Sequence, residues 1–194
     1  MRTRRHALVF LLAAGLVPAT AVAQSSAWVD RVTEKWNAAG AAIPAPPASH
    51  ELKAALVQRC ASIVVTEGAA AALLAQAGWT PFLHLDRRIA RDDVDVVGGM
   101  AAATPDCQPA MFNLFVFLGG RFAGTLAPSP MSLARDGVAG AVRLAGTDSI
   151  TAEFARYGPA DSECCPSSVV RVTYRINRGT PAPVLEAVEM RRVR

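Results

Sequence analysis

The sequence predicts an α+β fold in which N-terminal helices pack on an antiparallel, mostly meander β-sheet. Two observations carry this prediction. Helix-period patterns with capping residues occupy residues from about 26 to 77, and strand-length runs separated by turn residues fill about 79–191. Helices that come first, followed by consecutive strands, are typical of α+β domains. The length suits one domain with a sizeable core, so we expect residues 24–194 to form a single domain.

Residues 1–23 have the three parts of a secretory signal peptide. Arginines near the start precede an apolar run over residues 7–17, and residues 21–23 (Ala-Val-Ala) supply the small side chains of a cleavage site. The run is shorter than the roughly 20 residues that span a bilayer. We therefore expect export to the periplasm or beyond, with cleavage after Ala23 and no transmembrane segment afterwards. The arginine pair at positions 4 and 5 leaves open whether the general secretory or the twin-arginine route is used.

Three helices are expected in the N-terminal part. Trp28, Val32 and Trp36 recur every four residues and predict a short amphipathic helix, whose tryptophans either pack on the domain or form an exposed aromatic face. The proline-rich residues 43–48 cannot be helical and form a stiff connector. A second helix follows, with Cys60 near its end. An alanine-rich third helix covers residues 66–77.

Eight strands are expected after this helical part. Their predicted ranges are 79–85, 94–101, 111–118, 121–126, 141–145, 150–157, 168–177 and 184–190. The run at 111–118 is apolar throughout and should be the most buried. Gly119 and Gly120 follow it directly, which predicts a tight hairpin. Residues 168–177 alternate between apolar and polar side chains, as a half-buried strand does.

The chain has four cysteines, two of them adjacent. Neighbouring cysteines can join each other only through a strained eight-membered ring, so we expect Cys164 and Cys165 to pair with Cys60 and Cys107. Either order is possible. Cys60–Cys164 with Cys107–Cys165 is favoured because Cys164 shares the sequence parity of the apolar Val170. The alternatives are a single bridge and free cysteines that act as small buried apolar residues.

Charge and motifs exclude several functions. The net charge of +4 falls close to neutral once the arginines of the signal peptide are removed, so a nucleic-acid surface is not supported. The sequence contains no G-x-S-x-G, H-E-x-x-H, P-loop or C-x-x-C motif. The common hydrolase, zinc-protease, nucleotide-binding and thiol-exchange classes therefore lack their signatures, and no catalytic residue is assigned.

No metal or cofactor is expected. Aspartates at positions 86, 92, 93 and 95 could supply oxygen ligands for calcium, but arginines sit among them and the spacing of a calcium loop is missing. His50 and His84 are the only histidines after the signal peptide, and an oxidising compartment favours disulfides over zinc for the cysteines.

Arg121 and Phe122 form the candidate binding surface. They follow the predicted glycine turn, and residues at the tip of a tight hairpin are exposed. An arginine beside an aromatic residue is a combination enriched in binding hot spots. The alternative is that Phe122 folds back under the Trp28–Trp36 helix and belongs to the core.

Residues 113–128 (NLFVFLGGRFAGTLAP), together with Tyr157, Cys-Cys-Pro-Ser and Val-Thr-Tyr-Arg within residues 157–175, resemble the LppP/LprE lipoprotein family of bacterial envelope proteins. The family name implies a lipidated N-terminal cysteine, whereas here no cysteine precedes Cys60. The resemblance supplies no catalytic residues. It implies a secreted or periplasmic envelope protein with a non-catalytic binding or structural role and an unknown envelope partner or ligand. The alternative is a small envelope hydrolase that uses His84 with Asp86.

Overall fold

The computed structural model describes residues 28–30, 35–49, 52–84, 89–132, 138–158, 160–162 and 164–193. The predicted signal peptide lies outside these residues.

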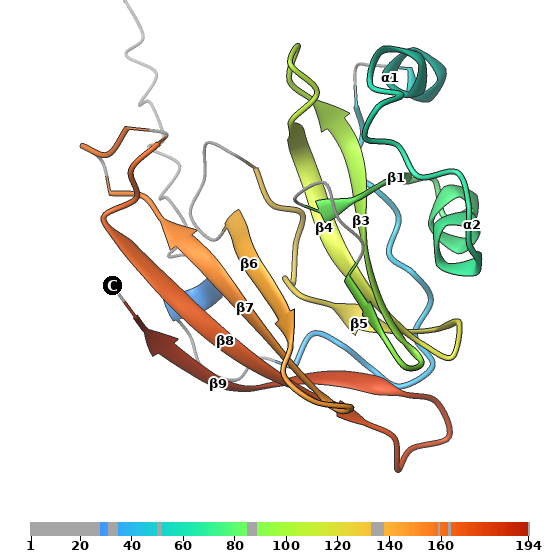
Figure 1. The fold of residues 1–194 in the computed structure, drawn as a ribbon, viewed down its shortest axis with the longest axis vertical. Helices are drawn as coiled ribbons and strands as arrows, with labels where there is room; N and C mark the ends of the chain where they lie inside the picture. The colour runs from blue at the N-terminus through green and yellow to red at the C-terminus, as the bar shows by residue number, and fades with distance from the viewer. Residues whose placement is uncertain are drawn as a thin grey trace, which may run out of the picture.

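The described strands form two antiparallel sheets (Figure 1). Sheet A has the order β1-β3-β4-β5, and β2 also pairs with β3. Its strands are β1 (Thr80–Phe82), β2 (Ile89–Arg91), β3 (Val94–Ala103), β4 (Pro109–Leu118) and β5 (Arg121–Thr125). Sheet B has the order β6-β7-β8-β9. Its strands are β6 (Val138–Leu144), β7 (Ser149–Arg156), β8 (Ser168–Asn177) and β9 (Val184–Arg192).

The fold is mostly antiparallel β-structure, and the described part also contains two short helices, α1 (Lys53–Arg59) and α2 (Ala69–Gln76). The prediction of one meander sheet is wrong. The chain forms a meander within β3–β5 and another within β6–β9, but no pairing joins β5 to β6. Sheet B has one apolar face, and this face and the facing side of sheet A bury each other where the sheets pack together.

The first predicted helix is not observed as such. Only a single 3-10 turn, Trp28–Asp30, is described there, and residues 35–38 are not helical. Trp28 and Trp36 are half-buried and still pack against the core. Trp28 packs edge-to-face on Phe154 of β7, with ring centres 4.8 Å apart, and Trp36 packs on Tyr174 of β8 at 6.4 Å.

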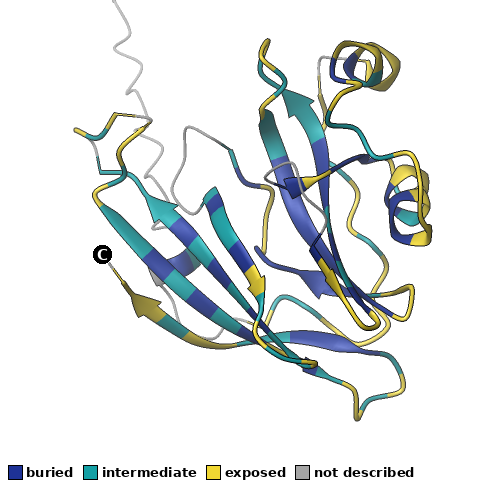
Figure 2. Cartoon of the chain, in the orientation of Figure 1, coloured by how far each residue is buried: buried dark blue, intermediate teal, exposed yellow. Residues whose placement is uncertain are grey.

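The main core lies between the two sheets (Figure 2). Strand β7 alternates between buried and half-buried residues and points Ile150, Ala152 and Phe154 into this core. Strand β4 is buried continuously from Phe112 to Leu118, as its apolar run predicted. Its alternate residues face the other side of sheet A, where a second cluster contains Ala70, Leu74, Trp79, Phe115 and Phe117.

Polar side chains join the sheets where their edges meet. Asn37 Nδ2 donates to the carbonyl oxygens of Thr125 in β5, at 3.0 Å, and of Leu185 in β9, at 3.1 Å. Its Oδ1 accepts from the Thr125 amide at 2.9 Å, and Trp36 Nε1 donates to Thr125 O at 2.9 Å. One short segment of chain thus fastens edge strands that belong to different sheets.

Candidate functional site

Four turns lie together at one end of the molecule, which we call the turn end (Figure 1, bottom). They are residues 92–93 before β3, 119–120 before β5, 145–148 before β7 and 178–183 before β9. The first two turns contact directly, because the Gly119 amide donates to Asp93 O at 2.7 Å. The turn end therefore gathers connections from both sheets into one surface.

Arg178 fixes three of these turns in place. Its Nη1 and Nη2 donate to the two carboxylate oxygens of Asp93 at 2.8 and 3.1 Å. Its Nε donates to the Asp148 carboxylate, and Nη2 also donates to Thr147 O at 3.1 Å. Each guanidinium nitrogen therefore has a protein partner. Arg178 and Asp148 belong to the turns of sheet B and Asp93 to a turn of sheet A, so this cluster ties the sheets together at the turn end.

The charges in this cluster stabilise each other. The hydrogen bond from Arg178 lowers the pKa of the Asp93 carboxyl below its ordinary value of 3.8. Hydrogen bonds to Asp93 and Asp148 raise the pKa of Arg178 above its already high value. These shifts keep Asp93 and Arg178 ionised at neutral pH, which suits a positioning role.

The predicted hairpin at Gly119 and Gly120 is confirmed. Both glycines have positive φ, 54° and 75°, as a two-residue turn between antiparallel strands requires. Arg121 is exposed beside the turn, and its Nη2 donates to Pro181 O in the β8–β9 loop at 3.2 Å. The hairpin and that loop therefore meet at the turn end.

Phe122 is half-buried rather than fully exposed. Its ring centre lies 6.2 Å from that of Phe115 and 5.9 Å from that of Phe117, on the side of sheet A that carries the second cluster. This is not the location under Trp28 and Trp36 that the alternative interpretation gave it. The binding role of Arg121 and Phe122 stays a prediction, with Arg121 as its exposed member.

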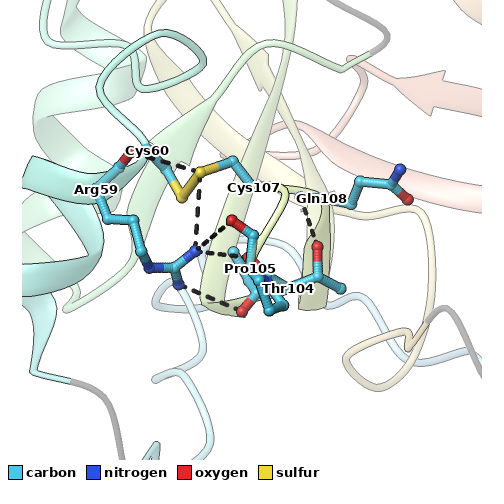
Figure 3. The surroundings of a disulfide bond; sticks show 7 residues. Arg59, Cys60, Thr104, Pro105, Cys107 and Gln108 are labelled. Atoms are coloured by element: carbon cyan, nitrogen blue, oxygen red, sulfur yellow. Dashed lines mark hydrogen bonds between the residues drawn. A yellow bond between two sulfur atoms is a disulfide. The ribbon is translucent and has the colours of Figure 1, made fainter.

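The two disulfides lie away from the turn end. Cys60, at the C-terminal end of α1, is bonded to Cys107 in the β3–β4 turn. The neighbouring Arg59 holds the same turn, since its guanidinium donates to Thr104 O at 2.6 Å and lies 3.4 Å from Pro105 O (Figure 3). This bridge fastens α1 to the tip of sheet A.

Cys164 and Cys165 are bonded to each other in the β7–β8 loop. The predicted pairing of Cys60 and Cys107 with Cys164 and Cys165 is therefore wrong. The physical reason is the division into two sheets, because the β3–β4 turn and the β7–β8 loop extend from different sheets whose ends diverge (Figure 1). The even or odd position of a residue along a strand predicts which face of the sheet its side chain is on. It does not predict which other part of the chain packs against that face.

His84 has a structural contact. It is buried, and its Nε2 lies 2.7 Å from Gly140 O in β6, so it joins the end of the β1 segment to sheet B. Asp86, its proposed catalytic partner, and His50 lie outside the described residues. Within the part of the chain that the structure describes, no group of three His, Cys, Asp or Glu side chains is arranged to hold a metal ion. No helix among those residues is long and apolar enough to cross a membrane.

Sequence reasoning missed the residues that organise the turn end. Asp93 was weighed as one aspartate of a calcium site that was not expected, and no role was predicted for Asp148 or Arg178. The separation of 85 residues between Asp93 and Arg178 leaves no local pattern to detect. Asn37 was missed for the same reason. The one available signal was the occurrence of charged side chains in several predicted turns, since turns of consecutive hairpins return to the same end of a sheet.

Residues 93–179 match the LppP/LprE lipoprotein family, which confirms the resemblance for the C-terminal part of the chain. The matched region begins at Asp93 and ends just after Arg178, so it contains both partners of the ion pair that joins the sheets. No curated protein and no solved structure matches the chain.

Proposed function

We propose, from the match of residues 93–179 to the LppP/LprE lipoprotein family, that this chain is exported and works in the bacterial cell envelope as a non-catalytic binding or structural protein. Its contact surface is the turn end, with Arg121 and Phe122 as the principal side chains.

The observation that carries this proposal is the fixed arrangement of four turns from two sheets. Binding residues are found disproportionately on loops held by a rigid scaffold. Here Arg178 holds its turns by bonds from every guanidinium nitrogen, so it serves as a positioning residue. The turns are thereby ordered before a partner arrives, and a preordered surface loses less conformational entropy on binding.

Arg121 is the main candidate for contact with a partner. It is exposed, it lies between two of the turns, and within the described residues its guanidinium donates to a backbone carbonyl, Pro181 O, at 3.2 Å. A planar guanidinium supplies several donors in a fixed geometry for a carboxylate or a carbonyl group. Phe122 follows Arg121 in β5, so its half-exposed ring faces the other side of the strand and offers apolar area beside the same turn. Arginine and aromatic residues are the types enriched at hot spots.

Site-specific photo-crosslinking tests this surface. A photoreactive residue replaces Arg121 in one variant and Arg191 in a matched control, because Arg191 is exposed near the far end of β9. We expect a discrete adduct in envelope preparations from position 121 and none from position 191. Equal adducts from both positions, or none from 121 in cells where the protein is folded and abundant, would contradict the proposed surface.

Export and the absence of catalysis are tested separately. Cell fractionation with intact-mass analysis should find the chain in the envelope or medium, cleaved after Ala23. Cytosolic protein that retains Met1 would rule out the export part of the proposal. Turnover of an ester, peptide or phosphate substrate that a His84→Asn variant loses while keeping its melting temperature would instead support the hydrolase alternative.

A further inference from the structure

The β7–β8 loop carries an exposed disulfide whose surroundings differ from those of the other one. Cys164 and Cys165 are both exposed, whereas Cys60 is completely buried. Disulfide exchange requires a thiolate to reach one of the two sulfurs, so access largely decides which bond reacts. Both residues of the loop bond are exposed to solvent, whereas the Cys60–Cys107 bond has one sulfur-bearing residue inside the core.

The loop disulfide also contributes little to the stability of the fold. A disulfide stabilises mainly by restricting the unfolded chain, and the effect grows with the length of the loop that it closes. Cys60 and Cys107 are 47 residues apart, whereas Cys164 and Cys165 are adjacent. Breaking the loop bond therefore leaves the constraints on the unfolded chain almost unchanged, and the fold can tolerate either redox state.

The base of the loop is held without the disulfide. Asp161 Oδ2 accepts hydrogen bonds from the backbone amides of Gly158, at 2.6 Å, and Ser167, at 2.7 Å. These bonds lower the pKa of Asp161 below 3.8, so its carboxylate stays ionised and keeps both contacts at neutral pH. Cys164 and Cys165 lie between the two anchored amides. A change at the sulfurs is thus confined to the tip of the loop.

We propose that Cys164–Cys165 is a redox-active site that exchanges with a dithiol reductant, while Cys60–Cys107 remains a structural bridge. The surroundings also indicate which of the two sulfurs is attacked and which is released. Ser162 Oγ lies 3.1 Å from Cys164 Sγ, where its hydroxyl can donate to a thiolate. A thiol whose thiolate is stabilised leaves faster, so the attacking sulfur bonds to Cys165 and Cys164 is released.

The exchange balances as a two-electron reduction. A thiolate of the dithiol attacks Cys165 Sγ, the Cys164–Cys165 bond breaks, and the Cys164 thiolate takes a proton from water. In the mixed disulfide, the first sulfur of the reductant is bonded to Cys165 Sγ. The second thiolate of the reductant attacks that first sulfur and releases Cys165 as a thiolate, which takes a proton from water. The loop gains two electrons and two protons, and the reductant becomes a disulfide. Because the two thiols stay adjacent in the chain, the reverse oxidation is intramolecular and favoured by proximity.

Graded reduction of the folded, oxidised full chain with dithiothreitol tests this proposal. Free thiols are alkylated and mapped by mass spectrometry at each concentration, and the melting temperature is recorded in parallel. We expect Cys164 and Cys165 to be alkylated at concentrations at least about tenfold below those needed for Cys60 and Cys107, with the melting temperature unchanged. Simultaneous reduction of both bonds, or oxidised protein in which Cys164 and Cys165 are not bonded to each other, would overturn the proposal.

Ser162 provides the second measurement. Ser162→Ala should slow reduction of the loop bond about fivefold, the factor that one hydrogen bond of typical net strength implies. Ser129→Ala is the matched control, since Ser129 is exposed in the connection after β5. With glutathione as a monothiol probe, the trapped adduct should sit on Cys165. An adduct mainly on Cys164, or an equal rate in the two serine variants, would reject the assigned direction.

Discussion

Asn37 uses a single amide group to hold strands from two different sheets, and the strand beside it accommodates that group only because it carries a glycine. A Cβ atom added at Gly124 would lie 2.4 Å from Asn37 Cγ, and the φ of 149° at this position is rarely adopted by other residues. We expect Gly124→Ala to lower the free energy of unfolding by about 1–3 kcal/mol, through overpacking and backbone strain. Urea denaturation of the folded protein measures the change.

The control for this variant is Gly146→Ala. A Cβ at Gly146 would meet nothing within 4 Å, and its φ lies outside the left-handed range. Its stability should stay within about 0.5 kcal/mol of the parent protein, as for most surface substitutions. Asn37→Ala combined with Gly124→Ala should cost less than the two single changes together, since Asn37→Ala removes the clash. Strict additivity would show that the close approach does not determine the effect.

Tyr174 makes stability sensitive to alkaline pH. It is fully buried and its hydroxyl donates to Leu126 O, and burial raises its pKa well above the ordinary value of 10.0. The unfolded chain ionises this group near pH 10 while the folded chain keeps the proton, so stability is lost as pH rises above 10. Compared with Tyr174→Phe, the parent protein should lose about 1.4 kcal/mol more for each pH unit above 10.

Urea denaturation at several pH values between 9 and about 11 supplies this comparison. The half-buried Tyr157 is the only other tyrosine in the chain and is present in both proteins, so its contribution cancels. Parallel pH dependences in the two proteins would show that Tyr174 ionises as readily in the folded state as in the unfolded state.

Among the structural elements, α1 depends on the Cys60–Cys107 bridge. The helix has seven residues and no side-chain cap at its N-terminus, and Leu56 is its one buried residue. A helix of this length is not stable alone. We expect the double substitution of Cys60 and Cys107 by Ser to lower stability by about 2–4 kcal/mol, the usual contribution of a native disulfide.

The matching double substitution of Cys164 and Cys165 by Ser serves as the control. It removes a bridge between adjacent, exposed residues and should change the melting temperature by less than about 2 °C. Protection of α1 amides from hydrogen exchange should fall only in the first variant. A larger loss of stability from the Cys164 and Cys165 substitutions would reverse the assigned roles of the two bridges.

At the scale of the whole molecule, the ion pair between Asp93 and Arg178 links stability to acid pH. The folded-state pKa of Asp93 lies below 3.8, so its contribution is present above that value and is lost as pH falls through the lowered pKa. The urea midpoint of the parent protein should fall more steeply below pH 4 than that of Asp93→Asn. Arg178→Gln should remove the same pH dependence. An unchanged acid profile in both variants would show that the pair contributes nothing measurable in solution.

The sequence predicted individual elements better than their assembly. Residues 168–177 form β8 as predicted, and β4 and β5 flank the predicted glycine turn, because alternation and turn residues act locally. The division into two sheets was not predictable, because the alternation of apolar and polar residues in β6 does not indicate which strand it pairs with. The same limit made the cysteine pairing wrong. It also concealed the turn end, whose ion pair joins residues that are far apart in the sequence.

The helix predicted from the spacing of Trp28 and Trp36 is wrong for a different reason. Their spacing fits a helix face, but aromatic residues also recur at such intervals when a non-helical segment lines a core. In the structure the side chains are held by Phe154, Tyr174 and the Thr125 carbonyl, and these tertiary contacts override local propensity.

The bonds that Asn37 and Trp36 make to Thr125 also affect what β5 can do as an edge strand. An open edge is a template on which strands of other molecules can add, and proteins usually block it with charges, proline or a covering segment. The last residues of β5, Ala123, Gly124 and Thr125, carry neither charge nor proline. There the backbone amide and carbonyl of Thr125 are both occupied by side chains of a segment 88 residues earlier in the chain. That segment therefore prevents a strand of another molecule from pairing with β5 at Thr125, and so hinders polymerisation through this edge.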